Sequence, residues 1–219
     1  MYKLISTFVL NLFVILPLTA KDSIHLQTFK GESINPYVKD ITDLCITVFR
    51  EYPYCYEGTE EEYRPFIEHY AHSDNGIACL LFENDYPIGV AIGMPLNEMR
   101  EQYMDPFITA RPQENCDELF YLGEFVLLKE YRGRGLGKEM YLELEDLVRE
   151  NRNVKKMCFC KIDETNSEPT IPENYRSLDG FWEKLGFDQC DDVAMEAYWH
   201  DIGQIEASSH KLVYWLKSF

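Results

Sequence analysis

The feature that most constrains this chain is a strand, a glycine-rich turn and a helix that follow one another in its second half. Residues 119–128 are almost all apolar, and they lead into the run Glu130-Tyr131-Arg132-Gly133-Arg134-Gly135-Leu136-Gly137-Lys138. Apolar residues then recur at three- and four-residue steps from Leu136 to Val148, which is typical of a helix with one buried face. This order predicts a buried strand that ends next to the start of a helix packed on the same sheet.

The turn between the two elements has the chemistry of an anion site. The first turn of a helix leaves its N–H groups unpaired and carries the positive end of the helix dipole. The glycines at 133, 135 and 137 let an anion approach the backbone without a Cβ in the way. Arg132, Arg134 and Lys138 add positive charge. The segment therefore predicts a cradle for a phosphate or pyrophosphate, and a solvated glycine-rich turn is the alternative.

Two common phosphate loops do not fit this turn. A P-loop needs Gly, four residues and then Gly-Lys-Ser/Thr, but Arg132 stands at the first glycine and Glu139 follows Lys138. The dinucleotide fingerprint fits Gly133 and Gly135 but places Lys138 at its third glycine. The pattern that does match is R-x-x-G-x-G, which runs from Arg132 to Gly137.

A second motif lies downstream, in the segment Phe181-Trp182-Glu183-Lys184-Leu185-Gly186-Phe187, where Gly186 is placed to end a helix. Together the two motifs resemble the coenzyme A pyrophosphate loop and the closing helix of the GNAT acyltransferase superfamily. The resemblance covers residues 124–187 and implies an α+β fold with three layers. Its mixed sheet would have six to seven strands with helices on both faces, and residues 21–219 would form one such domain.

Periodicity and turn residues place the remaining elements. A first helix is expected to begin at Asn35-Pro36, and a second at Thr59, which can form a capping box with Glu62. Proline, amide and charged residues predict long loops at 95–118 and 165–176. Strands are expected at 24–29, 77–82, 87–94, 154–162 and 211–217, with a hairpin turn at Asn84-Asp85.

The first twenty residues have the pattern of a targeting segment. Lys3 is followed by a mainly apolar run from Leu4 to Ala20, which predicts a secretory signal or, alternatively, an uncleaved membrane anchor. Acetyl-CoA, which the resemblance implies as co-substrate, is expected in cytosol-like compartments. The sequence therefore leaves the localisation open between export or anchoring and the cytoplasm.

The charge and the cysteines exclude further classes. Lys and Arg total 21 against 38 Asp and Glu, a net charge of −17, so nucleic acid is not expected as a partner. The seven cysteines are odd in number and lack C-x-x-C spacing, which argues against a disulfide scaffold. Cys158 and Cys160 should point to one face of a strand. His69 and His72 have no matching second pair of ligands, so no metal site is predicted.

The resemblance also implies which residues would hold acetyl-CoA. At the pyrophosphate these are Arg132, Gly133, Arg134, Gly135, Leu136, Gly137 and Lys138, and at the pantetheine arm the backbone N–H groups of Val126 and Leu127. Glu124 is the only charged residue between Leu119 and Leu128. Since burial raises the pKa of a carboxyl group, Glu124 is the candidate general base, and a structural carboxylate is the alternative.

The family's closing helix carries a Tyr that protonates the leaving thiolate, but this chain has Trp182 there, whose indole cannot act as an acid. Tyr175 is the candidate substitute, with a packing role as the alternative. The departure leaves two functions open: an N-acetyltransferase, or a catalytically inactive module that binds coenzyme A or a partner. The acceptor would be an amine on a small molecule or a protein. Residues 51–63, with four Tyr and five Glu, would suit a cationic amine, and helix capping together with solvated charge is the alternative for this segment. The oligomeric state is not predicted.

Overall fold

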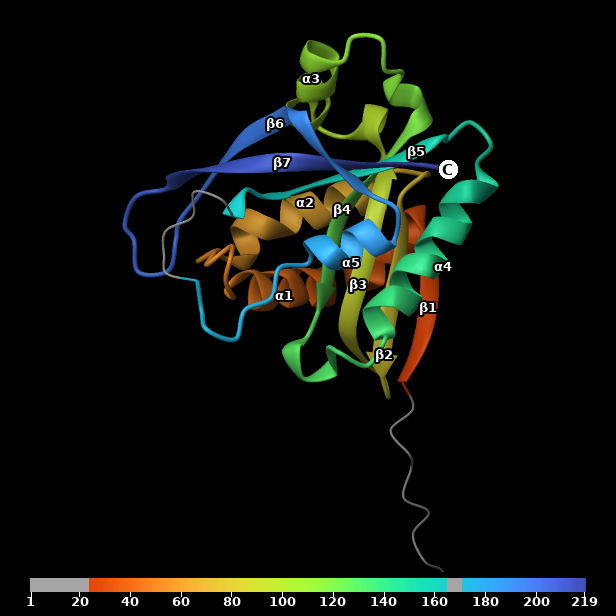
Figure 1. Ribbon diagram of the computed structural model, residues 1–219. Coiled ribbons are helices and arrows are strands. Elements are labelled where there is room, and N and C mark those ends of the chain that lie inside the picture. The colour runs from red at the N-terminus through yellow and green to blue at the C-terminus, as the bar shows by residue number, and fades with distance from the viewer. Residues whose placement is uncertain (1–23, 165–170) are drawn as a thin grey trace, which may run out of the picture.

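The computed structural model describes residues 24–164 and 171–219. The predicted signal or anchor at 1–20 and part of the loop predicted at 165–176 lie outside these ranges. The described residues form one seven-stranded mixed sheet in the order β1-β2-β3-β4-β5-β7-β6 (Figure 1), which confirms the predicted sheet. Its strands are β1 (Ile24–Lys30), β2 (Ile77–Glu83), β3 (Tyr86–Pro95), β4 (Leu119–Leu127), β5 (Lys156–Ile162), β6 (Asp188–Trp199) and β7 (Ser208–Ser218).

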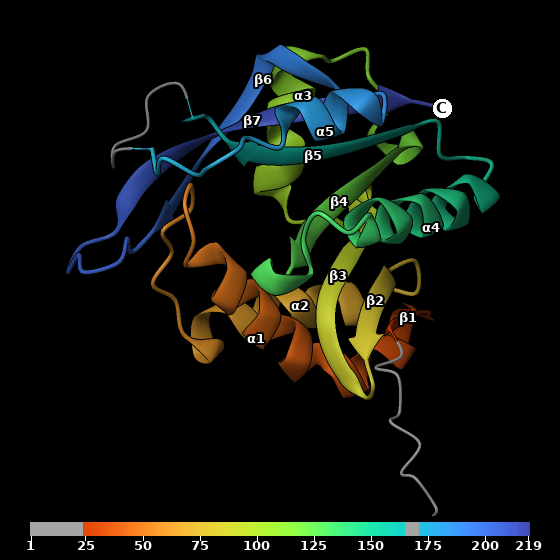
Figure 2. The same cartoon turned by 60° about the horizontal axis from the view of Figure 1, so that its bottom comes forward.

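Helices cover both faces of the sheet, as predicted. Helices α1 and α2 pack on one face, and α4 and α5 lie on the other (Figure 2). The helices are α1 (Val38–Phe49), α2 (Glu60–His72), α3 (Glu101–Ala110), α4 (Leu136–Glu150) and α5 (Asp179–Lys184). Across the described ranges, no helix is both long and apolar enough to cross a membrane.

Two buried clusters correspond to the two faces. Under α1 and α2, residues such as Ile41 and Ile67 meet Val90 and Val126 of the sheet. Under α4 and α5, the buried core includes Leu144 and Trp182. Because β2, β3 and β4 are covered on both sides, they consist largely of consecutive buried residues, which explains why their sequences are apolar without alternation.

The sheet divides in the middle. Strand β4 pairs with β3 in antiparallel fashion along most of its length. Its parallel pairing with β5 is confined to Leu119–Tyr121 opposite Lys156–Cys158. Beyond Tyr121 the two strands diverge, and Figure 1 shows β5 and β7 running across the direction of β2 to β4. No described strand pairs with the β5-side edge of β4 after Tyr121.

Several local predictions are confirmed. Thr59 and Glu62 form the reciprocal capping box at the start of α2. Asn84, with a φ of 56°, lies in the turn that joins β2 to β3. Gly186 follows the end of α5 in the left-handed region, with a φ of 91°.

The predicted start of the first helix is wrong. Residues 31–37 form a 3₁₀ turn, and α1 begins only at Val38. The side chain of Ser33 accepts a hydrogen bond of 2.9 Å from the N–H of Lys30. The chain is therefore already turned before Asn35 and Pro36, and those two residues lie inside the 3₁₀ turn and cap no α-helix.

The predicted loop at 95–118 is also wrong, because it contains α3. Phe107 is fully buried and packs edge-on against the Tyr214 ring at 4.9 Å between centroids. The Tyr214 hydroxyl donates a 2.9 Å hydrogen bond to the Tyr103 carbonyl. Tyr103 and Phe107 are one helical turn apart, and their contacts with Tyr214 stabilise this helix. The proline and the charged residues of the segment had favoured a loop in the sequence.

Strand β6 was not predicted as an element. Its buried residues Cys190, Val193 and Met195 do not keep a strict period of two. The register with β7 shifts between Gln189 and Ala194, and this irregularity breaks the alternation by which a strand is identified.

Candidate functional site

The glycine-rich turn is an open loop at the end of β4. A short 3₁₀ turn, η4 (Lys129–Tyr131), leads into it, and Gly135 is the N-cap of α4. Gly133 and Gly135 have φ values of 74° and 86°, which a residue with a side chain rarely adopts. A Cβ built on either glycine would meet no heavy atom within 4 Å. The backbone therefore borders open space on this side, as an anion cradle requires.

The other predicted loop residues surround this space. Arg132, Arg134 and Lys138 are exposed, and the Arg134 guanidinium lies 5.6 Å from the centroid of the Tyr131 ring. Leu136 and Gly137 begin the helix and are half-buried, and a Cβ on Gly137 would lie 3.5 Å from the ring of Phe125. Glycine at 137 thus keeps the first turn of α4 close to the end of β4.

Strand register decides which N–H groups of β4 are available. The Leu128 N–H donates a 3.0 Å bond to the Ile88 carbonyl of β3. In an antiparallel ladder, the N–H groups of successive residues point alternately to the two sides of the strand. The Val126 N–H therefore also points to β3, whereas the Leu127 N–H points to the edge from which β5 has diverged. The Arg132 Nε donates to the Leu127 carbonyl at 2.8 Å, which is consistent with this direction.

The prediction of an available N–H therefore remains for Leu127, but the register does not support it for Val126. The second N–H on the open edge belongs to Phe125, two residues before Leu127. Sequence reasoning missed Phe125, although counting in steps of two along the strand would have found it.

A bulge at Gly123 turns Glu124 towards α1 and α2. The register of β3 and β4 shifts here, since Ile92 lies opposite Glu124 but Gly93 lies opposite Leu122. One extra residue moves all later side chains to the other face. Only glycine fits at 123, because a Cβ would lie 1.8 Å from the Tyr70 hydroxyl oxygen. The bulge thus places Glu124 on the same face as Tyr121 and Val126.

Glu124 is buried among tyrosines. Its side chain shares a hydrogen bond with Tyr63 of α2, and Tyr54, Tyr56, Tyr70 and Tyr103 are near enough to interact with its charge. Burial raises the pKa of the Glu124 carboxyl to about 7, and the hydrogen bond from Tyr63 opposes this only in part. A carboxyl group with that pKa exchanges a proton near neutrality. Tyr63 belongs to the segment 51–63 that the sequence singled out, but its contact with Glu124 was not predicted, because only the packing of α2 brings it to β4.

Tyr175 lies in a polar network at the end of β5. Its hydroxyl donates a 2.9 Å hydrogen bond to Glu164, which also pairs with Lys161 at 2.8 Å. Burial and this bond raise the pKa of Tyr175 well above its ordinary value, so the hydroxyl stays protonated. The Tyr52 ring contacts the Tyr175 ring edge-on at 4.6 Å. Tyr175 therefore lies beside the segment that follows α1, and within residues 24–164 and 171–219 no hydrogen bond or ring contact joins it to Glu124.

Trp182 occupies the core under α5. It is 4% exposed, and its ring packs against Phe125, Phe159 and Phe187. The indole thus fills the space between α5 and the β4 edge, where a hydroxyl-bearing ring was expected from the resemblance. Phe125 carries one of the two N–H groups on the open edge of β4, and its ring contact with Trp182 holds it in place.

The loop at 50–59, called here the α1–α2 loop, is joined to the turn between β6 and β7. The Glu57 N–H donates to the His200 carbonyl and the Ile202 N–H donates to the Cys55 carbonyl, each at 2.8 Å. The Trp199 indole N–H donates to the Tyr54 carbonyl at 3.0 Å. These bonds hold the aromatic and acidic loop over the face of the sheet that carries Glu124.

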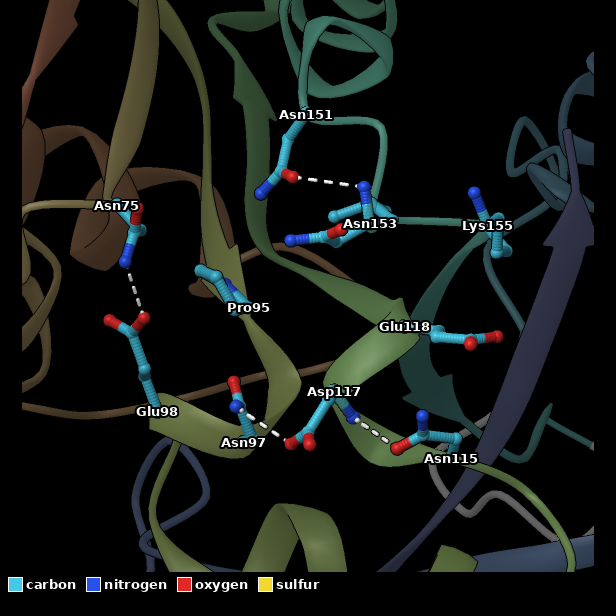
Figure 3. Close-up of a pocket in the computed structure, with 11 residues that line it drawn as sticks. Asn75, Pro95, Asn97, Glu98, Asn115, Asp117, Glu118, Asn151, Asn153 and Lys155 are labelled. Carbon is cyan, nitrogen blue, oxygen red and sulfur yellow. Dashed lines mark hydrogen bonds between the residues drawn. The ribbon is translucent and has the colours of Figure 1, made fainter.

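The pocket in Figure 3 is separate from this site. It has a volume of about 400 Å³ and lies where β4 and β5 begin, beside Asn115, Asp117 and Lys155. The glycine loop follows the other end of β4, roughly 25 Å away for a nine-residue strand. Two pairs of the pocket's polar side chains bond to each other, Asn75 with Glu98 at 2.6 Å and Asn97 with Asp117 at 2.9 Å.

Comparisons with known proteins agree with this geometry. The sequence profile described as "Acetyltransferase (GNAT) family" matches residues 42–187. Among solved structures, a GNAT-family acetyltransferase from Streptococcus pneumoniae has a TM-score of 0.54 at 16% identity, over 89% of this chain and 100% of that chain. The ribosomal-protein-alanine N-acetyltransferase from Brucella melitensis has a TM-score of 0.53 at 14% identity, over 89% of this chain and 99% of that chain.

A third structure was solved with coenzyme A. It is the PaiA N-acetyltransferase from Thermoplasma acidophilum, with a TM-score of 0.50 at 12% identity, over 90% of this chain and 99% of that chain. At such identities the likeness shows a shared fold. Among curated protein sequences, none matches the chain significantly. Because the profile matches more than half of the chain and includes both predicted motifs, the chain belongs to the GNAT acetyltransferase family.

Proposed function

We propose that this protein transfers an acetyl group from acetyl-CoA to a primary amine. The observation that carries the proposal is the open loop of left-handed glycines at the start of α4, next to the unpaired edge of β4. Membership of the family supports it, and so does the coenzyme A complex of the similar Thermoplasma protein.

The residues present fit coenzyme A. Gly133, Gly135 and the first N–H groups of α4 would hold the pyrophosphate, with positive charge from Arg134 and Lys138. The N–H groups of Phe125 and Leu127 would hold the pantetheine arm along the edge that β5 leaves free. When bound, acetyl-CoA supplies a thioester whose carbonyl carbon an amine can attack.

Glu124 is the proposed general base. An aliphatic amine is an ammonium ion at neutral pH and must lose a proton before it can attack. The Glu124 carboxyl, with a pKa of about 7, takes that proton directly or through a water molecule. Tyr175 is the proposed general acid, because its hydroxyl carries a proton at neutral pH and its ring contacts Tyr52 of the α1–α2 loop.

The acceptor is proposed to be a cationic amine. It would enter under the α1–α2 loop, where Tyr52, Tyr54 and Tyr56 offer aromatic faces and the carboxyl group of Glu124 lies beneath. The similar Brucella protein is named for acting on an alanine of a ribosomal protein, so a peptide N-terminus is one form that such an amine can take.

A thiol-release assay tests the activity. Purified protein with acetyl-CoA and a panel of primary amines should release free coenzyme A faster than the solution background. Protein that binds coenzyme A and yet releases no thiol with any amine would instead be an inactive binding module, which the tryptophan at 182 would then explain.

Gly135→Glu should weaken acetyl-CoA binding at least tenfold in calorimetry. The new carboxylate would stand in the open space at the N-cap of α4 and would repel the pyrophosphate. Gly203→Glu is a matched control, because Gly203 also has a positive φ of 80° and open space, but lies in the β6–β7 turn. Equal affinities for the two variants would contradict the assignment of the loop, and no binding by the wild type at millimolar acetyl-CoA would contradict the proposed function.

A further inference from the structure

Arg132, the first residue of the glycine motif, is held by a carboxylate from another part of the chain. Its Nη1 and Nη2 donate to the two carboxylate oxygens of Glu51 at 2.7 and 3.0 Å. Glu51 lies two residues after the end of α1, in the α1–α2 loop. This bidentate pair therefore joins the glycine-rich loop at 132–137, which is proposed to bind the acetyl donor and is called here the donor loop, to the α1–α2 loop on the acceptor side.

The pair leaves Arg132 without a free face for a phosphate. A guanidinium group offers two edges with paired N–H groups, one formed by Nη1 and Nη2 and one that includes Nε. Glu51 takes the first edge, and the Leu127 carbonyl accepts from Nε at 2.8 Å. A phosphate can bind Arg132 through two parallel hydrogen bonds only if one of these partners leaves.

Glu51 is the partner that can leave. The Leu127 carbonyl belongs to the backbone at the end of β4, whereas the Glu51 side chain is 36% exposed and the Arg132 side chain 39% exposed. A pyrophosphate carries more negative charge than a carboxylate, and at this place it would also meet the start of α4 and the charges of Arg134 and Lys138.

We propose that Glu51 is an exchangeable anion that occupies Arg132 until the pyrophosphate of coenzyme A replaces it, so that cofactor binding releases the α1–α2 loop from the donor loop. This inference rests on the proposed function and adds a regulation to it. Glu51 competes with the cofactor for Arg132, and the same residue is freed as a carboxylate beside Tyr52 on the acceptor side once the cofactor is bound.

The competition predicts a gain in cofactor affinity when Glu51 is removed. Glu51→Gln should bind coenzyme A about two- to fivefold more tightly than the wild type, which is the range that a half-exposed ion pair contributes. Affinity for pantetheine, which lacks the pyrophosphate, should not change. Isothermal calorimetry at one fixed ionic strength measures both. Glu51→Ala serves as a second variant with the same expected result.

Two controls separate competition from a general effect of charge. Glu130→Gln removes one negative charge just before the glycine-rich loop. Glu130 is exposed and, in the described residues, forms no ion pair with Arg132. This substitution should leave the affinity within experimental error. In an Arg132→Gln background, which binds coenzyme A more weakly, the further change Glu51→Gln should bring no gain.

The proposal is overturned if Glu51→Gln binds coenzyme A no better than the wild type, or more weakly, since Glu51 would then orient Arg132 without competing. It is equally overturned if the gain persists in the Arg132→Gln background. Wild-type protein that binds no coenzyme A would refute the proposed function itself. That outcome differs from a wild type that binds normally and is unaffected by the loss of Glu51.

Discussion

Replacing Glu124 by glutamine should lower kcat at pH 8 by about a hundredfold or more, the range that a general base contributes. The amide has nearly the shape of the carboxyl and can still accept the hydrogen bond of Tyr63, but it cannot take a proton from the acceptor ammonium. Acetyl-CoA affinity should stay nearly the same, because the glycine loop is untouched. Steady-state kinetics with calorimetry of acetyl-CoA binding measures both quantities.

The pH profile gives a second readout. Only the ionised carboxylate accepts a proton, so wild-type kcat should rise with pH and reach half of its maximum near the Glu124 pKa of about 7. The variant should lack that ionisation. An unchanged kcat and an unchanged profile in Glu124→Gln would return the residue to a structural role.

The same substitution should stabilise the protein at alkaline pH. The folded pKa of Glu124 lies above the value of 4.5 for the free group, so between these values the folded state holds a proton that the unfolded state has released. Wild-type stability therefore falls as the pH rises from about 4.5 through 7, and Glu124→Gln escapes this loss. The gain in the free energy of unfolding at pH 8 should be about 3 kcal/mol. Urea unfolding of both proteins at pH 5 and pH 8 measures it.

The other buried carboxyl in the described residues provides the contrast. Glu145 of α4 pairs with Lys217 at 2.6 Å and with Arg149, and these partners lower its pKa despite its burial. Glu145→Gln should therefore destabilise the protein while leaving kcat unchanged. If Glu124→Gln and Glu145→Gln both raised the free energy of unfolding at pH 8, the gain could not be attributed to the raised pKa of Glu124.

Gly123→Ala should cost about 1–3 kcal/mol of stability and also reduce kcat. The added methyl group would lie 1.8 Å from the Tyr70 hydroxyl oxygen and 2.5 Å from the ring carbon that carries it, so α2 or the bulge has to shift. Either shift moves Glu124 relative to Tyr63. For a chain of this size the melting temperature should fall by about 2–12 °C, as measured by circular dichroism.

Gly180→Ala is the matched control, because a Cβ there meets no heavy atom within 4 Å and the residue lies in α5. It should not lower the melting temperature. In the double variant Gly123→Ala with Tyr70→Phe, removal of the nearest atom should restore part of the loss. If the Gly123→Ala protein were as stable as the wild type, the Tyr70 ring would not be packed tightly against Gly123, and the prediction would be wrong.

The fold was predictable wherever local chemistry and tertiary packing agree. The turn at 132–137 combines left-handed glycines with a helix start, and its neighbours in sequence are also its neighbours in space. The helix α3 was not predictable in this way, because Phe107 is buried by Tyr214, a residue far along the chain. Strand β6 was missed for a related reason, since its irregular register is only visible once β7 lies beside it.

The site shows the same division. The unusual position of Glu124 in an apolar strand was visible in the sequence. The face of the sheet to which it points was not, because the bulge at Gly123 is visible only once β3 lies beside β4. The position of Arg132 was equally visible, whereas its pairing with Glu51 joins segments that are far apart in the chain. Sequence reasoning identified the groups with chemistry, and packing supplied their partners.

The divergence of β4 from β5 has a kinetic consequence. The glycine loop and α4 lie on one side of the sheet, and Glu124 with the α1–α2 loop serves the other. In the proposed reaction, donor and acceptor would therefore occupy the protein at once and meet at the gap between the two strands, and no acyl group would be carried by a side chain in between. Initial-rate plots at several fixed concentrations of the second substrate should therefore give lines that intersect and are not parallel.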